Sequence, residues 1–183
     1  MVQIHWGGGT PTYLSPEQIV DLGEHLRSRF NVAADAEISL EGDPRGLTEE
    51  HVAAASQAGF NRISFGVQDF TPEVQEAINR IQPEALTRQA VDWSRANGFD
   101  SVNLDLVYGL PHQDVTSFDV TLDTVLDIDP DRIALFSYAH VPSMMKHQQL
   151  IPEEALPDPP EKLAIFKRAV EKLTGVGGYR FIG

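Results

Sequence analysis

Residues 2–18 read VQIHWGGGTPTYLSPEQ, so that an apolar run, a glycine loop and a helix start follow one another directly. The run at 2–6 has the apolar character of a short β-strand. The SPEQ sequence at 15–18 has the form of a capping box with proline at the first helical position, which marks the start of a helix. This stretch therefore predicts a strand, a loop and a helix in succession, the beginning of a βα unit.

The same alternation continues along the chain with a period of about 30 residues, the size of a βα unit. Strands are predicted at 2–6, 36–41, 62–67, 101–107 and 132–137, and helices at 16–30, 49–57, 72–79, 84–97, 117–128 and 161–173. Strict alternation of this kind predicts parallel strands covered by helices, arranged either as an open doubly wound sheet or as a barrel.

Residues suited to ligand binding follow all five predicted strands. A barrel builds its site from many strand ends, whereas an open sheet concentrates its site at one switch point. We therefore predict an α/β fold that is a partial (βα) barrel of about five units, with parallel strands, outer helices and a single domain over residues 1–183. Because a full eight-unit barrel takes about 250 residues, we expect a segment of a longer protein that has at least one further βα unit ahead of it. The run at 179–182 is also strand-like.

Composition narrows the class of protein. Hydrophobic content of 42% and charged content of 22% are ordinary for a globular domain. The formal net charge of −13 argues against nucleic acid as a partner, because phosphate binding requires clustered lysine and arginine. With no apolar run near the ~20 residues that span a bilayer and no signal peptide pattern, we expect a cytoplasmic protein without a membrane partner. The lack of cysteine excludes disulfides and any thiolate-bound metal or cluster built from this chain alone.

The glycine loop at 7–10 is the first candidate binding element. Backbone N–H groups without side chains let an anionic or ammonium-carboxylate ligand approach closely, although a flexible turn is the alternative. Glu37 and Glu41 are spaced to lie on one face of the strand at 36–41. We expect Glu37 to be solvated at the strand's entrance, and Glu41 to share the rim with the glycine loop and bind an ammonium group or ribose hydroxyls.

Four polar residues further along the chain are also candidates, of which Arg80 lies between apolar residues at 78–81. Gln68 suits bidentate hydrogen bonding, while Asp69 beside it has the alternative of capping a helix. Arg80 could bind a carboxylate with its forked guanidinium or only cover the core with its stem. Asp105 is a carboxylate in an otherwise apolar strand, and a buried charge needs a partner, so we favour a functional role.

The histidines His5, His112, His140 and His147 could be interpreted as a metal constellation on a barrel rim. No His-x-His or His-x3-His pair is present, and scattered histidines are more often structural. No metal ligand is therefore predicted in this chain.

Six motifs, in order along the whole chain, closely resemble the family of oxygen-independent coproporphyrinogen III oxidases, which are radical S-adenosylmethionine (SAM) enzymes of haem synthesis. They are HWGGGTPT at 5–12, AEISLE at 36–41, RISFGVQDF at 62–70, AINRIQ at 77–82, NLDLVYGLP at 103–111 and RIALFSYAH at 132–140. The related haem-chaperone family usually has Gln-Ser where this chain has Gln68-Asp69, and Tyr-Gln-Leu in the region of FSYAH at 136–140. Both differences favour the oxidase.

The resemblance implies a partial barrel that holds a [4Fe–4S] cluster and two SAM molecules. It places the cluster's cysteine motif upstream of Met1 and a further domain after the C-terminus of this chain. Gly8 and Glu41 map onto contacts to the cluster-bound SAM. Contacts to the second SAM map onto Gly9, Thr10, Gln68, Arg80, Asp105 and Ala139.

In chemistry, the resemblance implies that a SAM-derived 5′-deoxyadenosyl radical converts two propionates of coproporphyrinogen III to vinyl groups, giving protoporphyrinogen IX. The implied partners are the porphyrinogen substrate and an electron donor protein, and the full-length enzyme is expected to be a monomer. We expect the isolated chain to be inactive, because it offers no cluster ligands. Two alternatives from other classes are a non-enzymatic SAM- or haem-binding module and a metal-dependent barrel hydrolase.

Overall fold

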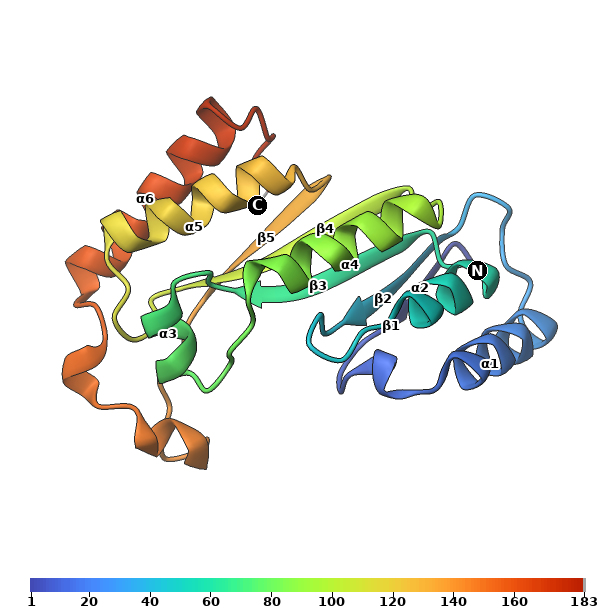
Figure 1. The fold of residues 1–183 in the computed structure, drawn as a ribbon, viewed down its shortest axis with the longest axis horizontal. Helices are drawn as coiled ribbons and strands as arrows, with labels where there is room; N and C mark the ends of the chain where they lie inside the picture. The colour runs from blue at the N-terminus through green and yellow to red at the C-terminus, as the bar shows by residue number, and fades with distance from the viewer. Residues whose placement is uncertain (183) are drawn as a thin grey trace. The chain divides into compact units, whose positions relative to one another are not determined.

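The computed structural model describes residues 1–182, in which five strands alternate with helices along the chain (Figure 1). The strands are β1 (Gln3–Trp6), β2 (Glu37–Gly42), β3 (Arg62–Gln68), β4 (Ser101–Tyr108) and β5 (Arg132–Ser137). The helices are α1 (Pro16–Arg29), α2 (Glu49–Gln57), α3 (Pro72–Ala77), α4 (Glu84–Ala96), α5 (Val115–Ile128) and α6 (Pro159–Gly175). Short 3-10 turns are η1 (Pro11–Tyr13), η2 (Lys146–Leu150) and η3 (Glu153–Ala155).

The strands form one sheet in the order β1-β2-β3-β4-β5. Registers of the first two pairs are parallel, with Ile4 opposite Ile38 and Leu40 opposite Ile63. Each strand neighbours the next one in sequence, as in a (βα) barrel, whereas a doubly wound sheet breaks this order at its switch point. The predicted α/β class is confirmed, but the strand-like run at 179–182 forms no strand.

The chain divides into two compact units. Unit 1 comprises Met1–Gly66, Glu84–Leu104 and Pro130–Arg132. Its helices α1 and α2 lie side by side (Figure 1), and Gly23 of α1 lets them approach, since a Cβ there would come within 2.7 Å of the Ala58 side chain. The predicted capping box at the start of α1 is confirmed. Apolar side chains with almost no exposure form the core of this unit: Ile19, Leu40, Val52, Ile63 and Phe65.

Glu37, at the amino end of β2, is ion-paired within unit 1, which corrects the expectation of a merely solvated carboxylate. Its Oε1 accepts a hydrogen bond from Arg62 Nη1 at 2.9 Å, and its Oε2 lies 3.3 Å from Arg132 Nη1. Partial burial raises the pKa of Glu37, but the hydrogen bond and charge of Arg62 and the charge of Arg132 lower it by more, so the net direction is down.

Unit 2 comprises Val67–Pro83, Asp105–Asp129 and the chain from Ile133 on. Helices α5 and α6 lie side by side in Figure 1. Apolar side chains of the two helices with almost no exposure are Phe118, Leu122, Val125, Ile165 and Ala169. Between the two helices, buried Lys172 donates to Asp119 at 2.9 Å and to Asp123 at 2.7 Å, so this cation is fully compensated.

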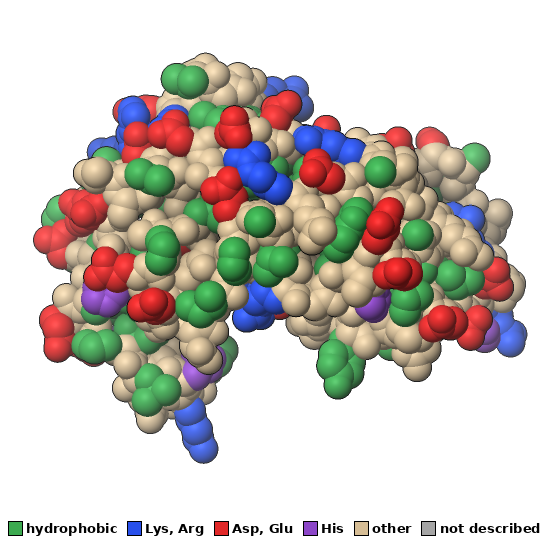
Figure 2. All heavy atoms as spheres, viewed as in Figure 1, with side chains coloured by type: hydrophobic (Ala, Val, Ile, Leu, Met, Phe, Trp, Pro, Cys, Tyr) green, Lys and Arg blue, Asp and Glu red, His purple; other side chains and the backbone are tan. Residues whose placement is uncertain are grey.

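Acidic side chains are scattered over the face drawn in Figure 2, in keeping with the net charge of −13. Among residues 1–182, no helix combines the length and the apolar character required to cross a bilayer.

Candidate functional site

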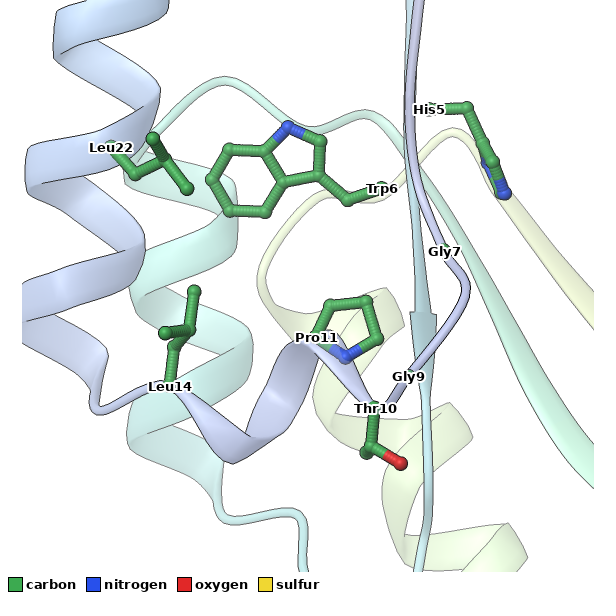
Figure 3. Close-up of a pocket in the computed structure, with 8 residues that line it drawn as sticks. All are labelled: His5, Trp6, Gly7, Gly9, Thr10, Pro11, Leu14 and Leu22. Carbon is green, nitrogen blue, oxygen red and sulfur yellow. The ribbon is translucent and has the colours of Figure 1, made fainter.

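The glycine loop leaves the carboxyl end of β1 and enters η1, all within unit 1. Gly8 has φ of +103°, a conformation that favours glycine. A Cβ added at Gly8 or Gly9 would meet no atom within 4 Å, so the backbone of both residues is open on that side. A cavity of about 420 Å³ lies beside the loop (Figure 3), lined by His5, Trp6, Gly7, Gly9, Thr10, Pro11, Leu14 and Leu22. The loop therefore combines accessible backbone with space for a ligand.

The surroundings of the first glycine of the loop differ from those of the second. Gly7 does not have a positive φ, but a Cβ at this position would lie 2.6 Å from His5 Nε2 and 2.8 Å from Glu41 Oε1. A side chain at position 7 would therefore displace the ends of the His5 and Glu41 side chains. Sequence reasoning missed this pair, because it depends on the register of β1 against β2.

Glu41, near the end of β2, lies next to the glycine loop as expected. Its side chain is 44% exposed, and its Oε1 lies 3.3 Å from Nε2 of His5. Nδ1 of the same imidazole lies 2.9 Å from the hydroxyl of buried Ser39. The carboxylate is therefore oriented by a histidine, and it stands beside the glycine loop, whose backbone is open on the Cβ side at Gly8 and Gly9.

Gln68 ends β3 in unit 2, and its backbone is strained. Its φ is +68°, and Asp69 N donates to Val67 O at 2.9 Å across it, which is the pattern of a classic γ-turn. Such a conformation persists only where the surrounding structure holds it. The half-buried Gln68 is therefore presented at the strand end by an enforced turn.

Asp69 supplies much of that support. Its side chain is fully buried, and its carboxylate accepts hydrogen bonds from Thr71 N at 2.6 Å, Gln113 Nε2 at 2.6 Å and Thr121 Oγ1 at 2.9 Å. Burial raises the pKa of Asp69, against hydrogen bonds from Thr71, Gln113 and Thr121 that lower it. The N-cap position of α3 belongs to Thr71, so Asp69 does not take the alternative role of helix cap. It forms instead a hub that joins the ends of β3 and β4 to α5.

The hub reaches β4 through Gln113. The side-chain amide of Gln113 also donates to Val107 O at 2.9 Å, and its Oε1 accepts from Leu110 N at 2.9 Å. Sequence reasoning did not single out Gln113. The signal for it in the sequence is an amide side chain shortly after a strand end, and its burial is seen in the structure.

The remaining predicted residues of unit 2 lie in a strand, after a helix and after a strand. Asp105 is half-buried in β4, so the expectation of a fully buried charge is corrected. Arg80 is half-buried just after α3, and its backbone N–H donates to Gln75 O at 2.8 Å. Ala139 is exposed after β5, and its carbonyl accepts from buried Gln148 at 2.9 Å.

The structure thus places Gly8, Gly9, Thr10 and Glu41 in unit 1, and it places Gln68, Arg80, Asp105 and Ala139 in unit 2. The histidines are dispersed, with His112 3.7 Å from Glu73 and His140 3.2 Å from the Tyr138 hydroxyl. Within residues 1–182, no three histidine or carboxylate side chains are grouped as a metal site would require.

Comparison with known proteins identifies the class. Residues 1–125 match the Radical SAM superfamily, so the chain belongs to that superfamily. The chain is similar to the oxygen-independent coproporphyrinogen III oxidase of Synechocystis sp., with 50% identity over 181 residues that cover 99% of this chain and 39% of that protein. The Helicobacter pylori (strain J99) protein of the same name is 46% identical over 184 residues, covering 100% of this chain and 40% of its own length.

Solved structures agree with this similarity. The structure of coproporphyrinogen III oxidase from Escherichia coli, a radical SAM enzyme, matches with a TM-score of 0.96 and 46% identity, covering 100% of this chain and 42% of that chain. The chain therefore spans about two fifths of the length of the curated relatives it matches, at 39% and 40%.

Proposed function

We propose that this chain is the SAM-binding part of an oxygen-independent coproporphyrinogen III oxidase. The observation that carries the proposal is the similarity to proteins of that name over 99% and 100% of this chain, at 50% and 46% identity. The confirmed radical SAM membership and the TM-score of 0.96 to the Escherichia coli enzyme support it.

The residues of unit 1 fit the methionine end of one SAM molecule. Open backbone at Gly8 and Gly9 suits a carboxylate, and the Glu41 carboxylate beside the loop suits an ammonium group. We therefore assign Gly8 and Glu41 to this SAM. When bound, SAM supplies the 5′-deoxyadenosyl radical of this enzyme class, while the protein positions it.

A second SAM molecule is proposed for the other predicted contacts. They are Gly9, Thr10, Gln68, Arg80, Asp105 and Ala139, the contacts that the resemblance implies. The amide of Gln68 and the guanidinium of Arg80 can donate hydrogen bonds, and the carboxylate of Asp105 can accept them. That residues 1–183 form one domain also stays a prediction.

The residues of this chain do not fit an iron–sulfur cluster. The sequence contains no cysteine, and no group of metal-ligating side chains occurs within residues 1–182. Reconstitution with iron and sulfide is therefore expected to yield no [4Fe–4S] absorption band and no activity. A band that survives desalting, in stoichiometric amount, would contradict this assignment.

For the whole protein, we propose the oxidative decarboxylation of two propionates of coproporphyrinogen III to vinyl groups, giving protoporphyrinogen IX. We further propose a cytoplasmic monomer that takes electrons from a donor protein. Within this chain, the residues named above only bind and orient ligand.

Equilibrium dialysis of the chain against radiolabelled SAM and, separately, against haem tests the proposal. We expect saturable binding of SAM, weakened about tenfold by Glu41→Gln because a charge-assisted hydrogen bond is lost. The matched control is Glu24→Gln, an exposed carboxylate on α1. Tight binding of haem with no binding of SAM would instead favour the haem-chaperone alternative.

A further inference from the structure

We infer that His5 is a positioning residue that orients Glu41 for the ammonium group of a bound SAM. The inference rests on the proposed function of the glycine loop, and it adds a residue that the resemblance does not assign.

Strand register brings the three side chains together. His5 lies opposite Ser39 in the parallel pair of β1 and β2, and Glu41 follows two residues later on the same face of β2. Trp6 points to the other side of β1, toward Leu14 and Leu22 (Figure 3). His5 is thus the last side chain of β1 that lies on the same side of the strand as Glu41.

The imidazole is held at both nitrogens. Nδ1 lies 2.9 Å from Ser39 Oγ and Nε2 lies 3.3 Å from Glu41 Oε1. The Ser39 hydroxyl can donate to Nδ1 of a neutral ring, or it can accept from a charged ring and turn toward Ile4 O at 3.4 Å. In both cases Nε2 carries the proton that it donates to Glu41, so the ring orientation does not depend on its charge.

Gly7 lies beside this pair of side chains. Its backbone conformation does not call for glycine, yet a Cβ would overlap both His5 Nε2 and Glu41 Oε1, at 2.6 and 2.8 Å. The first glycine of the loop therefore makes room for the pair, while the next two expose backbone to the ligand.

The pair acts on ligand binding more than on folding. Both side chains are about half exposed, at 51% and 44%, and exposed ion pairs contribute little to stability. Among the hydrogen bonds of residues 1–182, only Oε1 of Glu41 is used, which leaves Oε2 for a ligand. Holding the carboxylate in advance reduces the entropy lost when the ligand binds.

Two conservative variants separate the two nitrogens. The amide nitrogen of His5→Gln reaches the position of Nε2, whereas that of His5→Asn reaches only the position of Nδ1. We expect His5→Gln to keep SAM affinity within about threefold of wild type in equilibrium dialysis, and His5→Asn to lose about tenfold. In the Glu41→Gln background, His5→Asn should cause no further loss, because His5 acts through Glu41.

A second readout needs no ligand. Long-range ¹H–¹⁵N spectra of the imidazole should show the His5 Nε2 resonance shifted by Glu41→Gln and unmoved by Glu24→Gln. An unshifted Nε2, or equal SAM affinity of His5→Gln and His5→Asn, would overturn the inference while leaving the proposed function intact. Absence of SAM binding by the wild-type chain would overturn the proposed function, with the Nε2 resonance still reporting on the pair.

Discussion

The two units hold their candidate site residues in opposite ways. In unit 1, Glu41 is half exposed and is oriented by one half-exposed histidine beside an open glycine loop. In unit 2, Gln68 is held in a strained turn by the fully buried carboxylate of Asp69 and its three donors. Substitutions in the first region should therefore change ligand binding with little effect on folding, and substitutions in the second should change folding first.

The largest effect is expected from Asp69→Ala in unit 2. The change leaves the half-buried Thr71 N–H without its acceptor and removes one acceptor from the buried Gln113, so the free energy of unfolding should fall by about 3 kcal/mol. Urea unfolding measures it, with Asp21→Ala on exposed α1 as the control, expected within about 0.5 kcal/mol of wild type. If both variants unfold at the same urea concentration as wild type, the hub has no energetic role.

Gly7→Ala tests the corresponding region of unit 1. The new methyl group displaces the ends of two flexible side chains, so SAM affinity should fall about tenfold, equal to about 1.4 kcal/mol, while stability changes by less than about 1 kcal/mol. Gly46→Ala is the matched control, because a Cβ there meets nothing within 4 Å. Unchanged SAM affinity in the Gly7 variant would show that the His5–Glu41 arrangement is irrelevant to the ligand.

Gln68→Gly should raise the free energy of unfolding by about 1 kcal/mol, because glycine relieves the strain of the positive φ. Thermal unfolding measures the change. Val67→Ala is a contrasting variant at the neighbouring buried position, and it should be less stable than wild type. A Gln68→Gly protein that melts below wild type would argue against a strained turn.

The smallest effect concerns pH. The pKa of Glu37 is lowered in the folded state, so its carboxylate stabilises the fold above the unfolded pKa, and this contribution is lost as the pH falls through the folded pKa. Glu37→Gln should therefore lower stability by about 0.5–1 kcal/mol near pH 7 and by nothing in strong acid. Urea unfolding at several pH values checks this, and a gap that widens on acidification would contradict it.

The pKa of Asp69 is shifted in the opposite direction from that of Glu37. Its pKa is raised in the folded state, so its protonated form stabilises the fold below the unfolded pKa, and that contribution is lost as the pH rises through the folded pKa. Acidification therefore weakens the ion pair of unit 1, while it removes the cost of burying a charged Asp69 carboxylate in unit 2.

Local signals in the sequence predicted most of the fold. Helix α2 and strand β5 were predicted with the observed bounds, and the capping box at Ser15 marked the start of α1 correctly. Helix α5 begins at Val115, before the predicted start at 117, because Asp114 forms a capping box with Ser117. Helix α6 begins at Pro159, before the predicted 161, because Asp158 caps it and proline is accepted in the first turn.

The support of the candidate site could not be predicted in the same way. Asp69 binds Gln113 and Thr121, which lie 44 and 52 residues further along the chain, and His5 meets Glu41 across 36 residues. Such contacts depend on strand register and on packing, which a short sequence window does not contain. The sequence indicated which residues stand at the strand ends, but not which residues hold them there.

The central claim is that the glycine loop of unit 1 binds the methionine end of SAM. Titration of the ¹⁵N-labelled chain with SAM, followed by two-dimensional NMR, tests it most directly. We predict saturable shifts of the amide resonances of Gly8, Gly9 and Thr10. The SAM affinity obtained from these shifts should fall about tenfold in Glu41→Gln and stay unchanged in Glu24→Gln. Saturable binding of SAM that leaves these three amides unmoved would contradict the account.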